Sequence, residues 1–169
     1  LIEIKRPIWL LERFLAIQSQ VTLPKSALTI VGTGPLQNQV EEFIQANNLQ
    51  GYVNFAGIQF DTSSYFNSAT HLVSSSTTEG LPITFFEAKL AGLIIVATPS
   101  GGGKEILDSN DLELSTFTEE EFENALISIF RSPPPSVSMR RDIKIRSSWM
   151  TSEMCARNYY ALISELILK

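Results

Sequence analysis

Two carboxylates, Glu79 and Glu87, flank a proline in the stretch EGLPITFFE and are separated by seven residues. Pro82 suits the first position of a helix, because its missing N–H would have no partner there. The backbone amides of Ile83 and Thr84 would then be free and would point out of the helix N-terminus. Together with the helix dipole they favour an anion. The residue types therefore predict a small anion site at this helix start.

The position of Glu87 within that helix raises a question of burial. Glu87 shares a face with Ile83 and Leu90, and the helix is apolar nearly all round, which predicts a buried carboxylate. Such a group is costly unless something hydrogen-bonds to it. The vicinal hydroxyls of a ligand, a structural arginine or a capping amide could each provide that hydrogen bond. The residue types alone therefore leave open whether Glu87 binds a ligand or stabilises the fold. Glu79 lies outside the helix, in a loop expected to be wet.

A repeated strand–helix pattern must position these residues. Short apolar runs without alternation predict strands buried on both faces. Their alternation with helices predicts an α/β fold, a Rossmann-like parallel sheet with helices on both faces and right-handed crossovers, in one domain over residues 1–169. The expected strands are 27–32, 52–57, 71–75 and 93–98, and the expected helices are 7–19, 36–48, 61–69, 82–91, 104–107, 118–130 and 149–168. Thr118 and Glu121 would form a capping box on the helix 118–130.

Ligands bind beyond the carboxyl ends of strands in open parallel sheets, which selects the loops 32–35, 57–60, 74–82 and 99–104. The sequence does not match the common motifs of other nucleotide-binding or catalytic sites. The glycines at 32 and 34 fail as a dinucleotide fingerprint because Gln37 stands where a third glycine is needed, so a nicotinamide enzyme is a weak alternative. The sequence contains no P-loop or nucleophile elbow, and its one histidine, His71, begins an apolar strand and is expected to be structural.

Composition narrows the class of protein further. With 169 residues, 44% of them hydrophobic, the chain can fill one ordinary core, and a net charge of −5 argues against binding nucleic acid. The single Cys155 excludes a disulfide framework and a thiolate metal site. The basic cluster from Arg140 to Arg146 is expected to be a solvated helix face. No apolar run approaches the roughly 20 residues of a transmembrane segment, and no signal peptide opens the chain, which fits a cytoplasmic location.

Several motifs in register resemble one enzyme family. The stretch EGLPITFFEAKLAG, with its E-x7-E spacing, resembles the most distinctive segment of the retaining GT-B glycosyltransferases of family 4, or group 1. LTIVGTGPL, YVNFAG, SSSTTEGLP and GGGKEIL follow in that family's order, and SSWMTSEMCARNYYALI resembles its last helix. One departure is that residues 108–118 are short and lack the usual glycine turn. The resemblance implies the donor-binding half of a two-domain enzyme.

The resemblance also implies roles for the matching residues. Glu79 would be the catalytic acid beside the transferred sugar, Glu87 would hold the ribose hydroxyls, and Lys5 would pair with the diphosphate. The amides of Ile83 and Thr84 would meet the diphosphate as well, and the loop of Gly57 and Ile58 would lie against the base. The full donor-binding set is Lys5, Gly57, Ile58, Gly80, Leu81, Pro82, Ile83, Thr84 and Glu87. No metal ion or other cofactor is strictly required, because these positive groups lie where negative charge develops.

The implied reaction moves a sugar from a nucleoside-diphosphate sugar to an acceptor with retention of configuration, in polysaccharide or glycolipid synthesis. The implied partners are the nucleotide-sugar donor and an N-terminal acceptor-binding domain of the same polypeptide. That domain, with a strand and the Gly-Arg pair usual before Lys5, is expected to precede Leu1. The protein would be cytoplasmic, or held at the inner face of the membrane through that domain. The alternatives are an epimerase-like domain, which would lack E-x7-E, and a non-catalytic nucleotide-binding or partner module.

Overall fold

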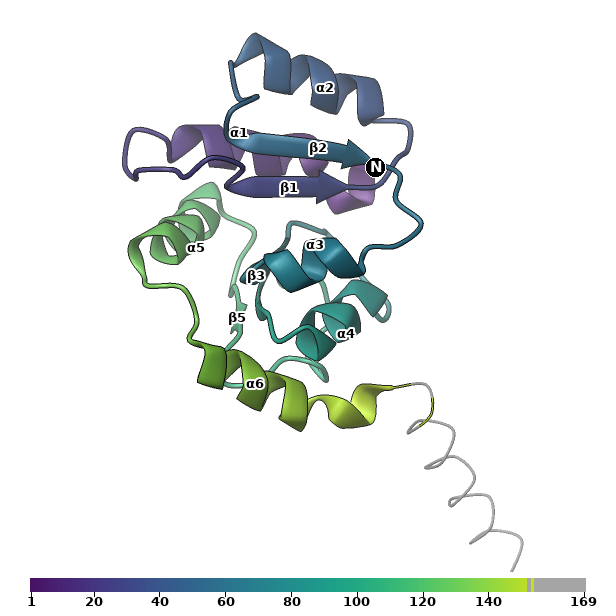
Figure 1. Cartoon of the computed structure of the whole chain (residues 1–169). Helices are drawn as coiled ribbons and strands as arrows, with labels where there is room; N and C mark the ends of the chain where they lie inside the picture. Colours follow the sequence, from purple (N-terminus) through teal and green to yellow (C-terminus); the bar gives the residue numbers. More distant parts are fainter. Residues whose placement is uncertain (152, 154–169) are drawn as a thin grey trace, which may run out of the picture.

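The structure is a computed structural model that describes residues 1–151 and 153, in which strands and helices alternate as the sequence predicts (Figure 1). The strands are β1 (Leu28–Val31), β2 (Val53–Gly57), β3 (His71–Ser74), β4 (Ile94–Ala97) and β5 (Leu112–Glu113). The helices are α1 (Pro7–Ala16), α2 (Gln37–Ala46), α3 (Ser63–Ser68), α4 (Ile83–Leu90), α5 (Glu119–Arg131) and α6 (Val137–Arg146), with short 3-10 helices at Glu3–Lys5 and Ser148–Met150. Cys155 and nearly all of the helix predicted for 149–168 lie outside the described residues.

All strand pairs are parallel, which confirms the predicted fold class, but the strands divide between two sheets rather than one. β1 pairs with β2, and β3, β4 and β5 pair in that order. Among the described residues no ladder joins β1 to β3. The N-terminal segment links the two sheets at their carboxyl ends instead. The Leu1 carbonyl accepts the amide of Leu36 after β1 (3.2 Å), and the Ile4 carbonyl accepts the amide of Thr77 after β3 (2.9 Å).

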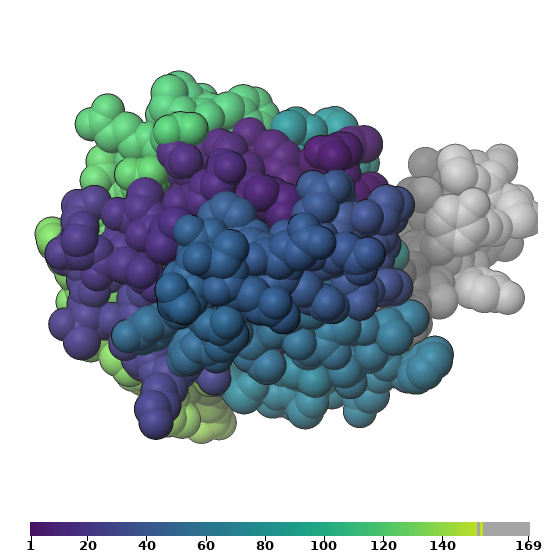
Figure 2. Space-filling model, turned by 90° about the horizontal axis from the view of Figure 1, so that it is seen from above, coloured from purple at the N-terminus to yellow at the C-terminus, as the bar shows by residue number. Residues whose placement is uncertain are grey.

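Helices cover both faces of β4, as an unalternating apolar strand requires. Ile95 and Ala97 belong to the core beneath α4, whereas Val96 packs into the core formed by α1 and α5. A third cluster buries one side of α1 and α2 against β1 and β2. Figure 2 shows the outer surfaces of α1 (purple) and α2 (blue) next to each other. Within residues 1–151 and 153, no helix combines the length and apolar character needed to cross a membrane.

The start of α4 differs from the prediction by one position. Pro82 is the N-cap residue, with an extended ψ of 102°, and Ile83 is the first helical residue. The Pro82 carbonyl accepts the amide of Phe85 (2.9 Å), which closes the first turn. Gly92 follows the end of this helix in a left-handed conformation, with a φ of 76° that favours glycine.

Two other local predictions are wrong. Residues 104–107 form consecutive turns rather than a helix, because Ile106 and Leu107 both donate to the carbonyl of Gly103. The capping box at α5 is absent, since Thr118 makes no side-chain cap. Glu121 reaches back past the helix start and accepts hydrogen bonds from Thr116 and Ser115, which lower its pKa to about 2.

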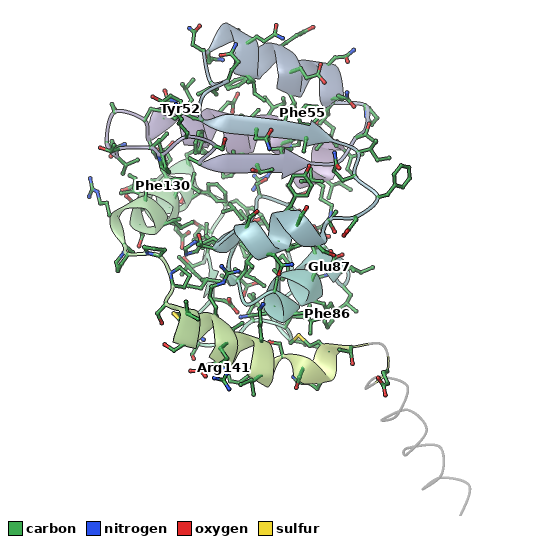
Figure 3. All side chains as sticks on the ribbon, in the orientation of Figure 1. Tyr52, Phe55, Phe86, Glu87, Phe130 and Arg141 are labelled. Atoms are coloured by element: carbon green, nitrogen blue, oxygen red, sulfur yellow. The ribbon has the colours of Figure 1, made fainter. Side chains whose placement is uncertain are left out.

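The basic cluster on α6 is only partly a solvated face. Arg140 donates to the carbonyl oxygens of Ala91 (3.2 Å) and Asn67 (3.3 Å), and Arg146 pairs with Asp108 (3.2 Å). Arg141, labelled in Figure 3, is exposed. Two of the cationic side chains therefore fasten α6 to α3, to the end of α4 and to the loop at Asp108.

Candidate functional site

Two of the predicted loops, 74–82 and 99–104, meet directly at the carboxyl end of the β3–β4 pair. Glu79 donates its amide to the Ser100 carbonyl (2.8 Å), and Gly102 donates its amide to the Glu79 carbonyl (3.1 Å). Glu79 and Gly101 thereby form an isolated parallel bridge. This bridge gives residue 79 a strand-like anchorage just before α4 begins.

The N-terminus of α4 presents unused donors to solvent. Within the described residues, the amides of Ile83 and Thr84 make no hydrogen bond, and no side chain caps the helix. The Ile83 side chain is 71% exposed, so the helix start faces solvent rather than the core. Free amides at the positive end of a helix dipole suit an anionic group.

Lys5 and Glu79 come together although 73 residues separate them in the sequence. The Lys5 ammonium lies 2.5 Å from Oε1 of Glu79, which also accepts a hydrogen bond from the Ser76 hydroxyl (2.6 Å). The Glu79 side chain is only 11% exposed, against 48% for Lys5. The loop is exposed at Thr77, Thr78 and Gly80, as expected. The Glu79 carboxylate is not, because the bridge to Gly101 and the bond from Ser76 turn it inward.

The main chain at Lys5 is fixed by a pair of bonds that the sequence analysis missed. The Ser75 hydroxyl donates to the Lys5 carbonyl (2.7 Å), and Nε of Arg6 donates to the Ser75 carbonyl (2.6 Å). The Arg6 guanidinium also lies over the Trp9 ring, 4.1 Å from its centroid, and burial lowers the pKa of Arg6. These contacts hold the short 3-10 helix of Lys5 against the end of β3.

Glu87 is half-buried, not buried as predicted, and its carboxylate has no hydrogen-bond partner among the described residues. The reason is that α4 is not covered all round, because Ile83 and Leu90 on the same face are exposed. Figure 3 shows Glu87 on the side of the molecule to which the arrows of β1 and β2 point, with Tyr52 toward the other side. The buried charge of this helix is instead Lys89, which pairs with Asp111 and Asp108. A lysine inside an apolar helix was the signal that could have found it.

The predicted base-binding loop lies at the end of the other sheet. Gly57 ends β2 with a φ of 65°, a conformation that favours glycine, and Ile58 after it is exposed. Leu81 is exposed as well, in the loop before α4. Gly80 packs against Gly102, and Pro82 is buried at the N-cap. The roles given to these residues stay predictions.

The start of α4 lies at the surface, where Leu81, Ile83 and Thr84 are exposed. Two hollows lie elsewhere: one of about 320 Å³ between α1 and α2, lined by Ile8 and Phe43, and one of about 240 Å³ beside Thr22 and Tyr52. Neither contains a predicted site residue. In the part of the chain that the structure describes, no cluster of His, Cys, Asp and Glu side chains could hold a metal ion. Any ligand at the α4 start would be covered on one side only, which favours weak binding.

Known proteins resemble this chain in both sequence and structure. It is 36% identical over 85 residues, half of its length, to an uncharacterized glycosyltransferase of Methanocaldococcus jannaschii, of which the match covers 21%. It is 23% identical over 168 residues, 94% of its length, to the GtfA subunit of the UDP-N-acetylglucosamine–peptide N-acetylglucosaminyltransferase of Limosilactobacillus reuteri, of which it covers 32%. It superposes on Anabaena HepE, crystallised with UDP and glucose, with a TM-score of 0.75 and 18% identity, over 98% of this chain and 46% of HepE.

The chain thus spans less than half the length of each of these relatives. Residues 1–132 match the family model for glycosyl transferases group 1, and they contain all the predicted site residues together with the loops that hold them. This chain belongs to the group 1 glycosyltransferase family.

Proposed function

We propose that this chain is the donor-binding domain of a retaining glycosyltransferase and that it binds the diphosphate of a UDP-sugar at the start of α4. The proposal depends chiefly on one observation. The unbonded amides of Ile83 and Thr84 follow closely on Glu79, whose carboxylate holds the Lys5 ammonium. The nucleotide is taken as UDP because HepE was crystallised with UDP and the GtfA enzyme is named for a UDP-sugar.

Negative charge develops on the leaving diphosphate as the transfer proceeds. The bond between the anomeric carbon and the diphosphate oxygen breaks, and the diphosphate keeps the electron pair. The acceptor oxygen forms the new bond to the anomeric carbon, and its proton passes to the departing diphosphate. The helix amides are fixed before the reaction, so they stabilise that charge without reorganising, whereas Lys5 must first leave Glu79. An arriving diphosphate competes with Glu79 for Lys5, which frees the Glu79 carboxylate to face the sugar.

A second domain is part of this proposal. The relatives are two to five times longer than the regions that this chain matches, so they have room for an acceptor-binding domain. The open surface at α4 would become one wall of a cleft. The chain alone is then expected to bind nucleotide weakly and to transfer no sugar.

A Glu87→Ala substitution tests the nucleotide site directly. Because Glu87 has no partner among the described residues, its loss leaves the packing of α4 intact and the melting temperature nearly unchanged. Hydrogen bonds to a charged group are worth about 1.5–3 kcal/mol, so UDP affinity is expected to fall by roughly 10- to 100-fold in a calorimetric titration. Glu42→Ala, which removes an exposed glutamate from α2, is the matched control and leaves both values unchanged. A lower melting temperature with unchanged UDP affinity would show that Glu87 is structural.

A further inference from the structure

Helix α4 carries a fully buried lysine in its last turn, at the opposite end from the proposed donor contacts. The Lys89 side chain has no solvent exposure, and its ammonium forms an ion pair with Asp111, which is equally buried. Asp108, which is partly exposed, lies 3.3 Å away. A cation is favourable at the negative end of a helix dipole, but its complete burial requires the carboxylate partners.

The Asp111 carboxylate joins three segments of the chain. One oxygen accepts the amide of Ile95 in β4 (2.8 Å), and the other accepts the amide of Asp108 (2.8 Å) and pairs with Lys89. Asp111 directly precedes β5, so a single carboxylate ties the end of α4 to both β4 and β5.

Asp108 extends the same network to α6. Its carboxylate accepts the amide of Asn110 (2.8 Å) and pairs with Arg146 (3.2 Å). Burial raises the pKa of Asp108, but the hydrogen bond from Asn110 and the charge of Lys89 outweigh burial and lower it. The Asp108 carboxylate therefore stays ionised at neutral pH and remains paired with Lys89 and Arg146.

The other end of α4 is fastened to the same strand. The continuation of β4 reaches Ser100 and Gly102, and these residues bond to Glu79 just before the helix. A helix of eight residues is only about 12 Å long, so a displacement at Lys89 is transmitted to its first turn. Replacing a buried ion pair by neutral residues of similar size is often neutral or stabilising. Stability alone therefore does not account for this pair, whereas a fixed helix position does.

We propose that Lys89 and Asp111 are positioning residues for the donor site. They set the axial position and the rotation of α4, so that the amides of Ile83 and Thr84 and the carboxylate of Glu87 face the donor. They touch no ligand themselves. The identity of that ligand rests on the proposed function above, but the geometric claim can be measured without any ligand.

The test compares Lys89→Met, the double variant Lys89→Met/Asp111→Asn, and Arg13→Met in the full chain. Arg13→Met breaks ion pairs between α1 and α5, far from α4, and is the control for lost stability. Lys89→Met is expected to lower the melting temperature, because Asp111 stays buried without its partner. The double variant is expected to regain most of that loss. The Ile83 and Thr84 amide resonances of the free double variant should nevertheless differ from those of the wild type. The double variant should also bind UDP at least tenfold more weakly than the wild type.

The control should melt lower while keeping the wild-type α4 resonances and UDP affinity. A double variant with wild-type Ile83 and Thr84 resonances would overturn the proposal, and so would one that no longer folds, because the pair would then serve stability alone. If the wild-type chain does not bind UDP, the proposed function fails. The resonances of the free double variant still decide whether the pair positions α4.

Discussion

A Gly102→Ala substitution is expected to lower the melting temperature of this chain by roughly 6–12 °C. Overpacking costs about 3 kcal/mol at its upper range, and each kcal/mol lowers the melting temperature of a chain of this size by ~2–4 °C. A Cβ on Gly102 would lie 1.3 Å from the Gly80 carbonyl oxygen and 2.3 Å from its carbonyl carbon. These are backbone atoms, so no side-chain rotation relieves the contact. The loops 74–82 and 99–104 would have to separate, and with them the anchorage of Glu79.

Gly80→Ala is the matched control for this prediction, since it changes the other glycine of the same contact. A Cβ on Gly80 meets no atom within 4 Å, and Gly80 has no positive φ. Differential scanning fluorimetry should therefore find Gly80→Ala within a degree or two of wild type. Equal melting of the two variants would show that the close approach of the loops is not rigid.

Glu79→Gln is expected to lower the turnover of a two-domain enzyme carrying this domain by on the order of 100-fold, the usual effect of removing a charged group that acts in the transition state. The same change should not weaken UDP binding by this chain. Glu79 neutralises Lys5 in the free protein, so its loss of charge leaves Lys5 available to the diphosphate. Glutamine keeps the shape of the side chain and can still accept the bond from Ser76.

Two measurements check this prediction independently. Initial-rate kinetics with saturating donor give the turnover, and a UDP titration of this chain gives the affinity. Normal turnover would contradict the catalytic role of Glu79. A loss of UDP affinity would instead place Glu79 in the nucleotide site.

Features that depend on neighbouring residues could be predicted from the sequence. The run before residue 98 gave β4, because it is apolar on both sides of the strand. The run before residue 32 gave β1, although Thr29 in it is exposed. The glycine at position 92 suits the end of α4 through its left-handed backbone, although a Cβ there would also meet the backbone of Arg140 in α6. The free amides at the start of α4 followed from the same local logic, even though Pro82 lies one position outside the helix.

Features that depend on distant contacts could not be predicted in this way. The sequence pattern expected Glu87 to be the buried charge of α4, but which face of the helix is covered depends on the elements that pack against it. Lys89 is the buried residue because Asp111, 22 residues further along, reaches it from the start of β5. The turn at 108–111 forms without the expected glycine, because the Asp108 carboxylate accepts the amide of Asn110 and closes it.

The burial of Glu79 has a similar origin. Its position depends on the bridge to Gly101 and on Lys5 at the far end of the sequence, neither of which a local pattern contains. The resemblance to the family gave Lys5 and Glu79 roles in one site, and the structure places their side chains in contact. It did not indicate that they would bind each other in the free protein.

The most direct test of the donor-site proposal is an amide NMR titration of the wild-type chain with UDP. The resonances of Lys5, of the loop at 57–58 and of residues 79–87 are expected to shift together, with one weak affinity. Those of α2, which lines the hollow beside Ile8 and Phe43, should stay in place. Shifts confined to α2 and that hollow, or no shifts at residues 79–87 at saturating UDP, would contradict the assignment of the α4 start as the donor site.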